Sequence, residues 1–346
     1  MQYRSTRGSK ENTLTAPQAI IQGLAQDGGL YVPVAFPQAN FKLEDLSKLS
    51  YKQIAAMVIS LFFDDFTKEQ ITTAVQSAYS EQWDDRSIVP IEKHDNHFYM
   101  ELFHGPTLAF KDIALQMLPQ LMTRAVQIEK IDKDIIILTA TSGDTGTASM
   151  RGFANQKGTD VIVFYPEGGV SPVQLKQMLS QRGNNLRAIA IKGNFDDAQT
   201  EVKKIFNDDS FKNRLNANGY QFSSANSINI GRLVPQISYY LYTYGQLVRR
   251  QEIKLGDEVN FAVPTGNLGD ILAGYYAKKL GLPIKKLICA SNENNVLTDF
   301  FNNGVYDKRR KFHLTNAPAM DILVSSNLER LLFDLYDENN YEVASL

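Results

Sequence analysis

Cysteine, histidine and net charge are all scarce in this sequence. One cysteine, Cys289, in 346 residues cannot form an internal disulfide, and its position in an apolar run predicts a buried bystander. The four histidines have no metal-ligand companions, so no zinc site is predicted. A formal net charge of −2 provides no basic surface for nucleic acid or for an anionic membrane. The composition therefore argues against a disulfide scaffold, a metal centre and a nucleic-acid partner.

Long apolar runs are also absent. No uninterrupted apolar segment approaches the length of a membrane span, and residues 1–8 lack the apolar core of a secretory signal. The hydrophobic fraction of 43% and the charged fraction of 21% are those of an ordinary globular protein. A chain of this length has room for roughly two domains. We expect a soluble, cytoplasmic protein with no membrane partner.

The first quarter of the chain predicts helices without obvious chemistry. Residues 15–27 combine a capping Thr15 with an apolar face and a glycine pair that follows the segment. Ser50 and Thr67 each precede a glutamine by three residues, which is the spacing of a capping box, and each opens an amphipathic stretch. We therefore assign residues 1–85 to a helical N-terminal region.

From residue 86 onward, apolar strands alternate with helices. A hairpin is predicted around Asp95-Asn96, followed by an amphipathic helix that contains Pro119. Such alternation is typical of an α/β fold with parallel sheets covered on both faces, in which ligands bind where strands end and helices begin. The later strands are predicted at residues 135–139, 161–165, 186–191, 260–263 and 287–290.

The stretch His-Gly-Pro-Thr-Leu-Ala-Phe-Lys-Asp, residues 104–112, places one lysine on an apolar approach to the helix. Lys111 is either a solvated charge, as most lysines are, or a working amine. A lysine whose pKa is lowered by apolar walls can form a Schiff base with an aldehyde cofactor. His104 is interpreted either as a packing residue or as one that orients a substrate.

Two glycine-rich loops follow predicted strands. Gly266-Asn267-Leu268-Gly269-Asp270 allows close backbone approach at a helix N-terminus, where unpaired N–H groups favour a phosphate. The alternative is a tight turn that needs glycine only for its dihedral angles. The loop lacks the Gly-Lys-Ser/Thr ending of a nucleotide-binding P-loop. Ser142, Gly143, Asp144 and Thr145 repeat the geometry with groups that suit a carboxylate, or that simply cap a helix.

A third polar segment, residues 223–232, precedes a helix rich in tyrosine. It contains Asn226, Ser227, Asn229 and Arg232, which suit a second phosphate or the ring hydroxyl of a cofactor, or else a capped helix start. Two loops that favour anions and one unusual lysine together suit a cofactor phosphate, a substrate carboxylate and an amine that binds an aldehyde. This combination is more specific than any of its parts.

Four segments in this order resemble the threonine synthase family, which belongs to the fold type II enzymes that depend on pyridoxal 5′-phosphate (PLP). They are residues 104–112, Leu-Thr-Ala-Thr-Ser-Gly-Asp-Thr-Gly (138–146), Ser-Ala-Asn-Ser-Ile-Asn (224–229) and Gly-Asn-Leu-Gly-Asp (266–270). The resemblance implies two parallel-sheet α/β subdomains of the tryptophan synthase β-like kind. It assigns them to residues 86–330, with the site between them.

The resemblance also implies an activity, the conversion of O-phospho-L-homoserine and water to L-threonine and phosphate by γ-elimination and β-addition of water. Lys111 would hold PLP as an aldimine and then move protons at Cα and Cβ. Residues 266–270 and Asn226 would bind the cofactor. The substrate would be bound by Ser142, Gly143, Asp144, Thr145, Ser227, Asn229 and Arg232, in a monomer or a homodimer.

Two features depart from the family pattern. Leu268 replaces the usual phenylalanine of Gly-Asn-Phe-Gly-Asp, which is a mild change if backbone amides bind the phosphate. Family members also continue past the position of Leu346, to a hydroxyl residue that faces the pyridine nitrogen, so residues 331–346 are expected to be an incomplete C-terminal segment. The alternatives are another fold type II lyase or dehydratase acting on serine or threonine, and a truncated, non-catalytic ligand-binding paralogue.

Overall fold

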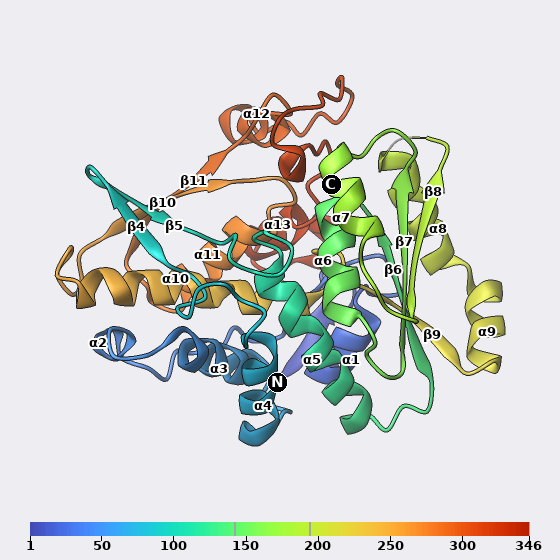
Figure 1. Cartoon of the computed structure of the whole chain (residues 1–346), viewed down its shortest axis with the longest axis horizontal. Helices are drawn as coiled ribbons and strands as arrows, with labels where there is room; N and C mark the ends of the chain where they lie inside the picture. Colours follow the sequence, from blue (N-terminus) through green and yellow to red (C-terminus); the bar gives the residue numbers. More distant parts are fainter. Residues whose placement is uncertain (142, 194, 346) are drawn as a thin grey trace.

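The computed structural model describes residues 1–141, 143–193 and 195–345. Figure 1 shows a four-stranded sheet at one side of the molecule, a two-stranded sheet at the other, and long helices between them. Both of these sheets are parallel, so the predicted α/β class is confirmed. Within the described ranges, no helix is long and apolar enough to cross a membrane.

The N-terminal region combines a small antiparallel sheet with four helices, drawn in blue in Figure 1. The strands lie in the order β2 (Leu14–Thr15), β1 (Gln2–Ser5), β3 (Tyr31–Pro33). The helices are α1 (Ala16–Gln22), α2 (Leu43–Leu46), α3 (Tyr51–Phe62) and α4 (Lys68–Ala78).

Capping boxes begin three of these helices. Thr15, Ser50 and Thr67 each accept a hydrogen bond from the backbone N–H three residues later, and the glutamine there accepts one from the capping residue's own N–H. The predicted helix starts are therefore confirmed. The prediction that the first helix extends to residue 27 is wrong. It ends at Gln22, because Gly23 adopts a φ of 69° and its N–H caps the last turn.

A hairpin and a long helix lead into the main sheet. Strands β4 (Ile91–His94) and β5 (His97–Met100) pair around the predicted turn, where Asp95 adopts a φ of 53°. The loop that follows carries Lys111 into α5 (Asp112–Ile128).

The main sheet has four parallel strands in the order β8, β7, β6, β9. Their bounds are β6 (Asp134–Ala140), β7 (Thr159–Pro166), β8 (Leu186–Ile191) and β9 (Tyr220–Ser224). Strand β9 was not predicted from the sequence, because its Gln221 and its two serines weaken the apolar pattern. It pairs directly with β6, and this places residues 224–229 beside the loop that follows β6.

The second sheet consists of β10 (Val259–Pro264) and β11 (Ile284–Ala290). Cys289 on β11 is only half buried, so the predicted buried position is wrong. The reason is that Cys289 lines an open apolar groove between β11 and the helices beside it, with Thr298 and Phe301 of α12 among the other lining residues.

Helices surround the two sheets. The longest, α10 (Ile230–Arg249), is buried from Ile230 to Leu247 and packs on α3, α5 and α11. The others are α6 (Asp144–Phe153), α7 (Pro172–Leu179), α8 (Phe195–Asn207), α9 (Asp209–Ala217), α11 (Gly269–Lys279), α12 (Val296–Asn303), the 3₁₀ helix η1 (Pro318–Met320), α13 (Leu328–Leu335) and α14 (Asn340–Ser345).

Helices α5 and α6 are packed with almost no space between their backbones. A Cβ atom on Gly152 of α6 would lie 2.0 Å from the carbonyl oxygen of Leu115 on α5. Lys111 immediately precedes α5, and Asp144 is the first residue of α6. The close approach therefore fixes how the C-terminal end of α6 packs against the first turn of α5.

Gly152→Ala tests this contact. Because a backbone carbonyl cannot rotate away as a side chain can, the helices must separate, and we expect the free energy of unfolding to fall by about 3 kcal/mol. The control is Gly168→Ala, where an added Cβ meets nothing within 4 Å and only the φ of 74° costs energy, about 1 kcal/mol. Urea unfolding measures both. Equal losses in the two variants would contradict the prediction.

Candidate active site

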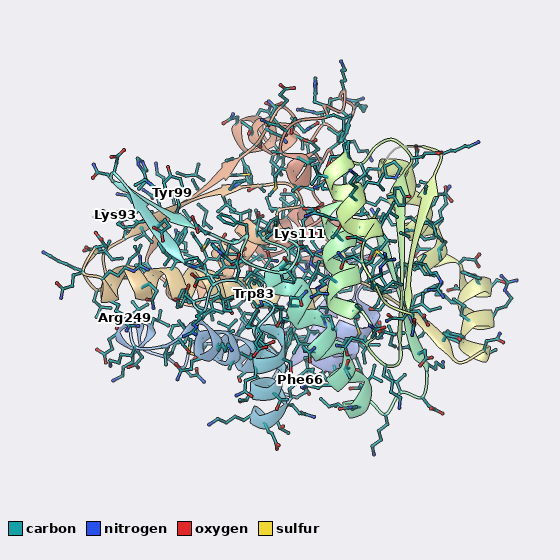
Figure 2. The ribbon with its side chains drawn as sticks, in the orientation of Figure 1. Phe66, Trp83, Lys93, Tyr99, Lys111 and Arg249 are labelled. Atoms are coloured by element: carbon teal, nitrogen blue, oxygen red, sulfur yellow. The ribbon has the colours of Figure 1, made fainter. Side chains whose placement is uncertain are left out.

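Lys111 lies near the middle of the molecule, whereas Lys93 and Arg249 lie toward its edge (Figure 2). Lys111 is 8% exposed. The preceding loop is closed by Asp112, whose carboxylate accepts hydrogen bonds from the Thr107 N–H (2.8 Å) and the Thr107 hydroxyl (2.7 Å). Burial raises the pKa of Asp112 to about 6, against the effect of these hydrogen bonds. This buried closure fixes the backbone from which Lys111 projects.

His104 begins the same stretch but faces other groups. Its ring lies 2.6 Å from a carboxylate oxygen of Asp84 and 2.8 Å from one of Glu101, and it stacks on Phe103. These contacts hold the start of the loop. They favour the packing interpretation of His104 over a role in orienting a substrate.

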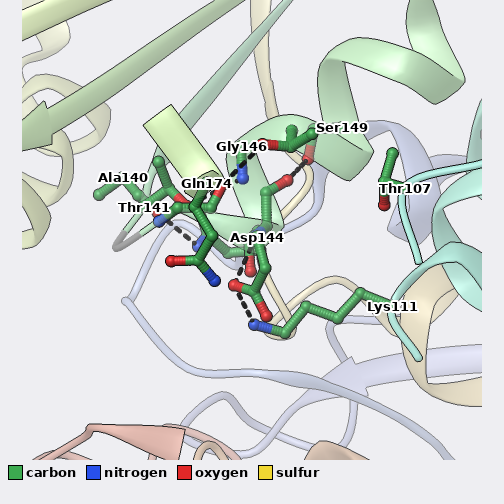
Figure 3. Close-up of polar contacts among 12 residues, drawn as sticks. Thr107, Lys111, Ala140, Thr141, Asp144, Gly146, Ser149 and Gln174 are labelled. Carbon is green, nitrogen blue, oxygen red and sulfur yellow. Dashed lines mark hydrogen bonds and ion pairs between the residues drawn. The ribbon is translucent and has the colours of Figure 1, made fainter. Parts of the chain in front are cut away.

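The Lys111 amine forms a buried ion pair with Asp144. Nζ donates to Asp144 Oδ1 at 2.7 Å, and the Thr145 N–H donates to the same oxygen at 2.7 Å (Figure 3). Asp144 Oδ2 is buried and has no hydrogen-bond partner. Burial lowers the pKa of Lys111, and the charge and hydrogen bond of Asp144 raise it again. The result is an amine that can lose its proton more easily than a solvated lysine.

The loop after β6 is organised around one hydroxyl. Thr141 Oγ1 accepts hydrogen bonds from the backbone N–H groups of Gly143 and Gly146, both at 2.9 Å. Gly143 has a φ of 142°, and a Cβ there would lie 2.5 Å from the side-chain oxygen of Gln174, so only glycine fits. Ser142, which was predicted to bind substrate, lies outside the described residues.

The glycine loop after β10 faces Lys111 from the other sheet. Gly266, Asn267, Gly269 and Asp270 line one cavity with Lys111. Burial raises the pKa of Asp270 to about 6, although the Ile271 N–H donates to its carboxylate at 2.9 Å. The loop turns into α11 at the point where unpaired N–H groups favour an anion.

Leu268 contributes its backbone to this loop and its side chain elsewhere. It adopts a left-handed φ of 62° and is 1% exposed. Its side chain lines a separate apolar groove of about 370 Å³, together with Ile271, Leu272 and Cys289. Leu268 therefore contributes to this groove and does not line the cavity that contains Lys111.

The third predicted segment divides between the cavity and the core. Asn226, Ser227 and Arg232 line the cavity with Lys111. Arg232 is 3% exposed, its Nη1 donates to Ala225 O at 3.0 Å, and its Nε has no partner. Burial lowers the pKa of Arg232 to about 10. Asn229 is fully buried and does not line the cavity. Its side-chain oxygen caps α10 by accepting from Gly231 N–H at 2.9 Å, and its side-chain nitrogen donates to Ile20 O and Ser224 O.

Most of the predicted site residues thus line one cavity, and four residues that were not predicted line it as well. Thr145 is the last of the predicted residues that line this cavity. Gln236, one helical turn after Arg232, is an addition that i,i+4 spacing could have indicated. Phe110 precedes the lysine and could also have been inferred. Ala319 and Met320 come from η1, and their residue types carry no signal of a site.

The cavity has the features needed to hold an aldehyde cofactor with a phosphate group. Lys111 provides the amine, and a glycine loop at a helix N-terminus provides a cradle for an anion. Gly266 is tightly packed there, since an added Cβ would lie 3.3 Å from the backbone of Met320. The unpartnered Nε of Arg232 provides a further donor. Among the described residues, no cluster of three or more His, Cys, Asp or Glu side chains could hold a metal ion.

Comparison with known proteins identifies the family. Residues 2–79 match the family model described as threonine synthase N terminus, and residues 90–346 match that of pyridoxal-phosphate dependent enzymes. The chain belongs to the threonine synthase family. A relative from Pseudomonas aeruginosa named threonine synthase is 40% identical across 100% of this chain and 71% of its own length.

Other members of the threonine synthase family are longer than this chain. The threonine synthase of Saccharomyces cerevisiae is 40% identical over 97% of this chain but only 66% of its own length. Threonine synthase-like 1 of Homo sapiens is 42% identical over 91% of this chain and 44% of its own length. The structure of PLP-bound threonine synthase from Brucella melitensis superposes with a TM-score of 0.87 at 40% identity, over 100% of this chain and 72% of that one.

Asp270→Asn tests the electrostatics of the cofactor-free site. A carboxyl whose pKa is about 6 when folded and 3.8 when unfolded holds its proton more tightly in the folded state. The free energy of unfolding should therefore fall as pH rises from about 4 to about 6, by up to about 3 kcal/mol from this group. The substituted amide keeps an acceptor for the Ile271 N–H but cannot titrate, so the variant should show a shallower fall in parallel urea titrations. An unchanged slope would contradict the raised pKa.

A double-mutant cycle measures the ion pair. Lys111→Met leaves Asp144 buried without its cation, and we expect a loss of about 3 kcal/mol in the free energy of unfolding. Asp144→Asn in the same protein should recover part of that loss, with a coupling energy of about 1–3 kcal/mol. Additive losses would mean that the two groups do not interact in solution.

Proposed function

We propose that this chain is a PLP-dependent threonine synthase that converts O-phospho-L-homoserine and water to L-threonine and phosphate. The observation that carries the proposal is the single cavity in which the buried amine of Lys111 faces the glycine loop 266–270. An amine and an anion cradle in one cavity suit a cofactor with an aldehyde at one end and a phosphate at the other. Family membership supports the same cofactor and the same reaction.

The residues that hold the cofactor follow from this layout. When bound, PLP supplies an aldehyde that reacts with the lysine amine and a ring that withdraws electrons from the substrate. Lys111 is assigned to the aldehyde. The backbone of Gly266, Asn267, Leu268 and Gly269 is assigned to the phosphate, and Asn226 and Asp270 flank it.

We assign Asp144 to proton transfer and not to binding of the substrate carboxylate. Two carboxylates side by side would repel each other, whereas the buried oxygen Oδ2 is free to accept from an ammonium group. Asp144 therefore binds the ammonium form of Lys111, or of the amino group of an incoming amino acid, and can accept the proton that the amine must give up before it reacts. The substrate carboxylate is assigned to Thr145 and the neighbouring backbone at Gly143, together with Ser142.

The phosphate of the substrate requires a second anion site. Arg232 lines the cavity, is buried, and forms no ion pair within the described part of the chain, so it retains charge for a ligand. Ser227 lies on the same wall. We assign the leaving phosphate to these two residues. A cytoplasmic location and a monomeric or homodimeric state remain predictions.

Phosphate release tests the function. With PLP, the chain should release phosphate from O-phospho-L-homoserine and should not act on serine or threonine. Lys111→Ala should abolish the visible absorption of the bound cofactor and lower phosphate release on the order of a thousandfold or more, because the reacting amine is lost. Lys93→Ala, which removes a half-exposed lysine on β4, should change neither.

Two other results would replace the proposal. Turnover of serine or threonine in place of phosphohomoserine would identify a different lyase or dehydratase of this fold. A Lys111-dependent absorption band without turnover of any of the three amino acids would identify a ligand-binding protein.

A further inference from the structure

Arg330 of α13 is a buried cation without a counter-ion. It is 1% exposed and forms no ion pair with any residue that the structure describes. Its donors go instead to neutral oxygens: Nε to Tyr31 O at 3.1 Å, Nη2 to Ile228 O at 2.6 Å and Nη1 to the side chain of Asn327 at 2.6 Å. Burial lowers the pKa of Arg330 to about 10.

A charge in this position is costly to maintain. Carbonyl oxygens solvate a guanidinium only in part, and a buried ion normally has a partner of opposite charge. If the Arg330 side chain served only to fill space, an apolar residue of similar volume would fill the same space without this cost in free energy. The unpaired charge therefore points to an anion that is bound nearby.

Asn327 connects Arg330 with the glycine loop. Its N–H donates to Asn267 O at 3.1 Å, and Ser325 donates its hydroxyl to Gly266 O at 2.6 Å. Because the Asn327 side-chain oxygen accepts from Arg330, its amide nitrogen is turned the other way. That nitrogen is buried without a partner, and a Cβ on Gly269 would lie only 3.4 Å from it.

We propose that Arg330, acting through Asn327, positions the loop 266–270 and gives it the positive potential needed to bind the phosphate of PLP. Arg330 is a positioning residue, since it does not itself line the cavity that contains Lys111. Asn327 provides the connection, with its oxygen fixed by the guanidinium and its free N–H directed to Gly269. This inference rests on the proposed binding of PLP and adds two residues from the C-terminal part of the chain to the phosphate site.

The test compares PLP with pyridoxal, which has the same aldehyde and ring but no phosphate. Dissociation constants for both are measured on the full chain by the visible absorption that depends on Lys111. Arg330→Met keeps most of the side-chain volume and removes the charge. We expect the Kd for PLP to rise about tenfold to a hundredfold and the Kd for pyridoxal to change less than about threefold. Arg330→Lys should fall between Arg330→Met and the wild type.

A matched control separates this role from simple support of the fold. Arg4 is also 1% exposed, but it pairs with Glu338 and stacks on Phe333, away from the glycine loop. Arg4→Met should destabilise the protein while leaving the ratio of the two dissociation constants unchanged. If Arg330→Met does not fold, Asn327→Ala is measured in the same way and should also weaken PLP selectively.

Equal losses of PLP and pyridoxal affinity in the Arg330 and Asn327 variants would overturn the inference, as would no loss of either. Wild-type protein that binds both compounds equally would overturn it too. Failure of the proposed function is a separate result. If the chain binds PLP but releases no phosphate from phosphohomoserine, the dissociation constants of PLP and pyridoxal can still be compared.

Discussion

The ion pair between Lys111 and Asp144 joins the N-terminal ends of two helices. At such an end the helix dipole favours a carboxylate and disfavours an ammonium, so Asp144 on α6 is well placed and Lys111 beside α5 is not. Burial acts on the lysine in the same direction. Asp144 opposes both effects most strongly, through its charge and its hydrogen bond, and the charge of Asp270 adds to its effect on the Lys111 pKa. The same two helices also pack backbone to backbone at Gly152, near the opposite end of α6 from Asp144.

Buried charges of both signs gather around the cavity. Lys111, Arg232 and Arg330 are buried cations, and Asp112, Asp144 and Asp270 are buried carboxylates. The two arginines lie on both sides of the glycine loop, with one in the cavity wall and one behind the loop. Neither arginine forms an ion pair within the described part of the chain, which suits ligands that carry phosphate groups.

The sequence predicted the parts of the site that lie on local motifs. Lys111, the loop after β6 and the loop after β10 are each recognisable because glycines, hydroxyls and a lysine follow apolar strands or precede helices. The helix caps at Thr15, Ser50 and Thr67 were predictable for the same reason, since a capping box involves only four consecutive residues.

Tertiary contacts could not be predicted from local sequence in this way. Nothing local to Asn229 distinguishes a helix cap from a ligand-binding amide, and nothing local to Met320 or Arg330 indicates that the chain returns to the glycine loop. Strand β9 was missed because its pairing with β6, and not its composition, makes it a strand.

Leu268 belongs to two surfaces at once. Its left-handed backbone forms part of the turn that faces Lys111, and its side chain forms part of the wall of the apolar groove on the opposite side of the same turn. Binding at the turn and binding in the groove would therefore involve the same residue. Where one of the two changes the affinity of the other, linkage requires the reverse effect to be of equal size, whichever ligand binds first.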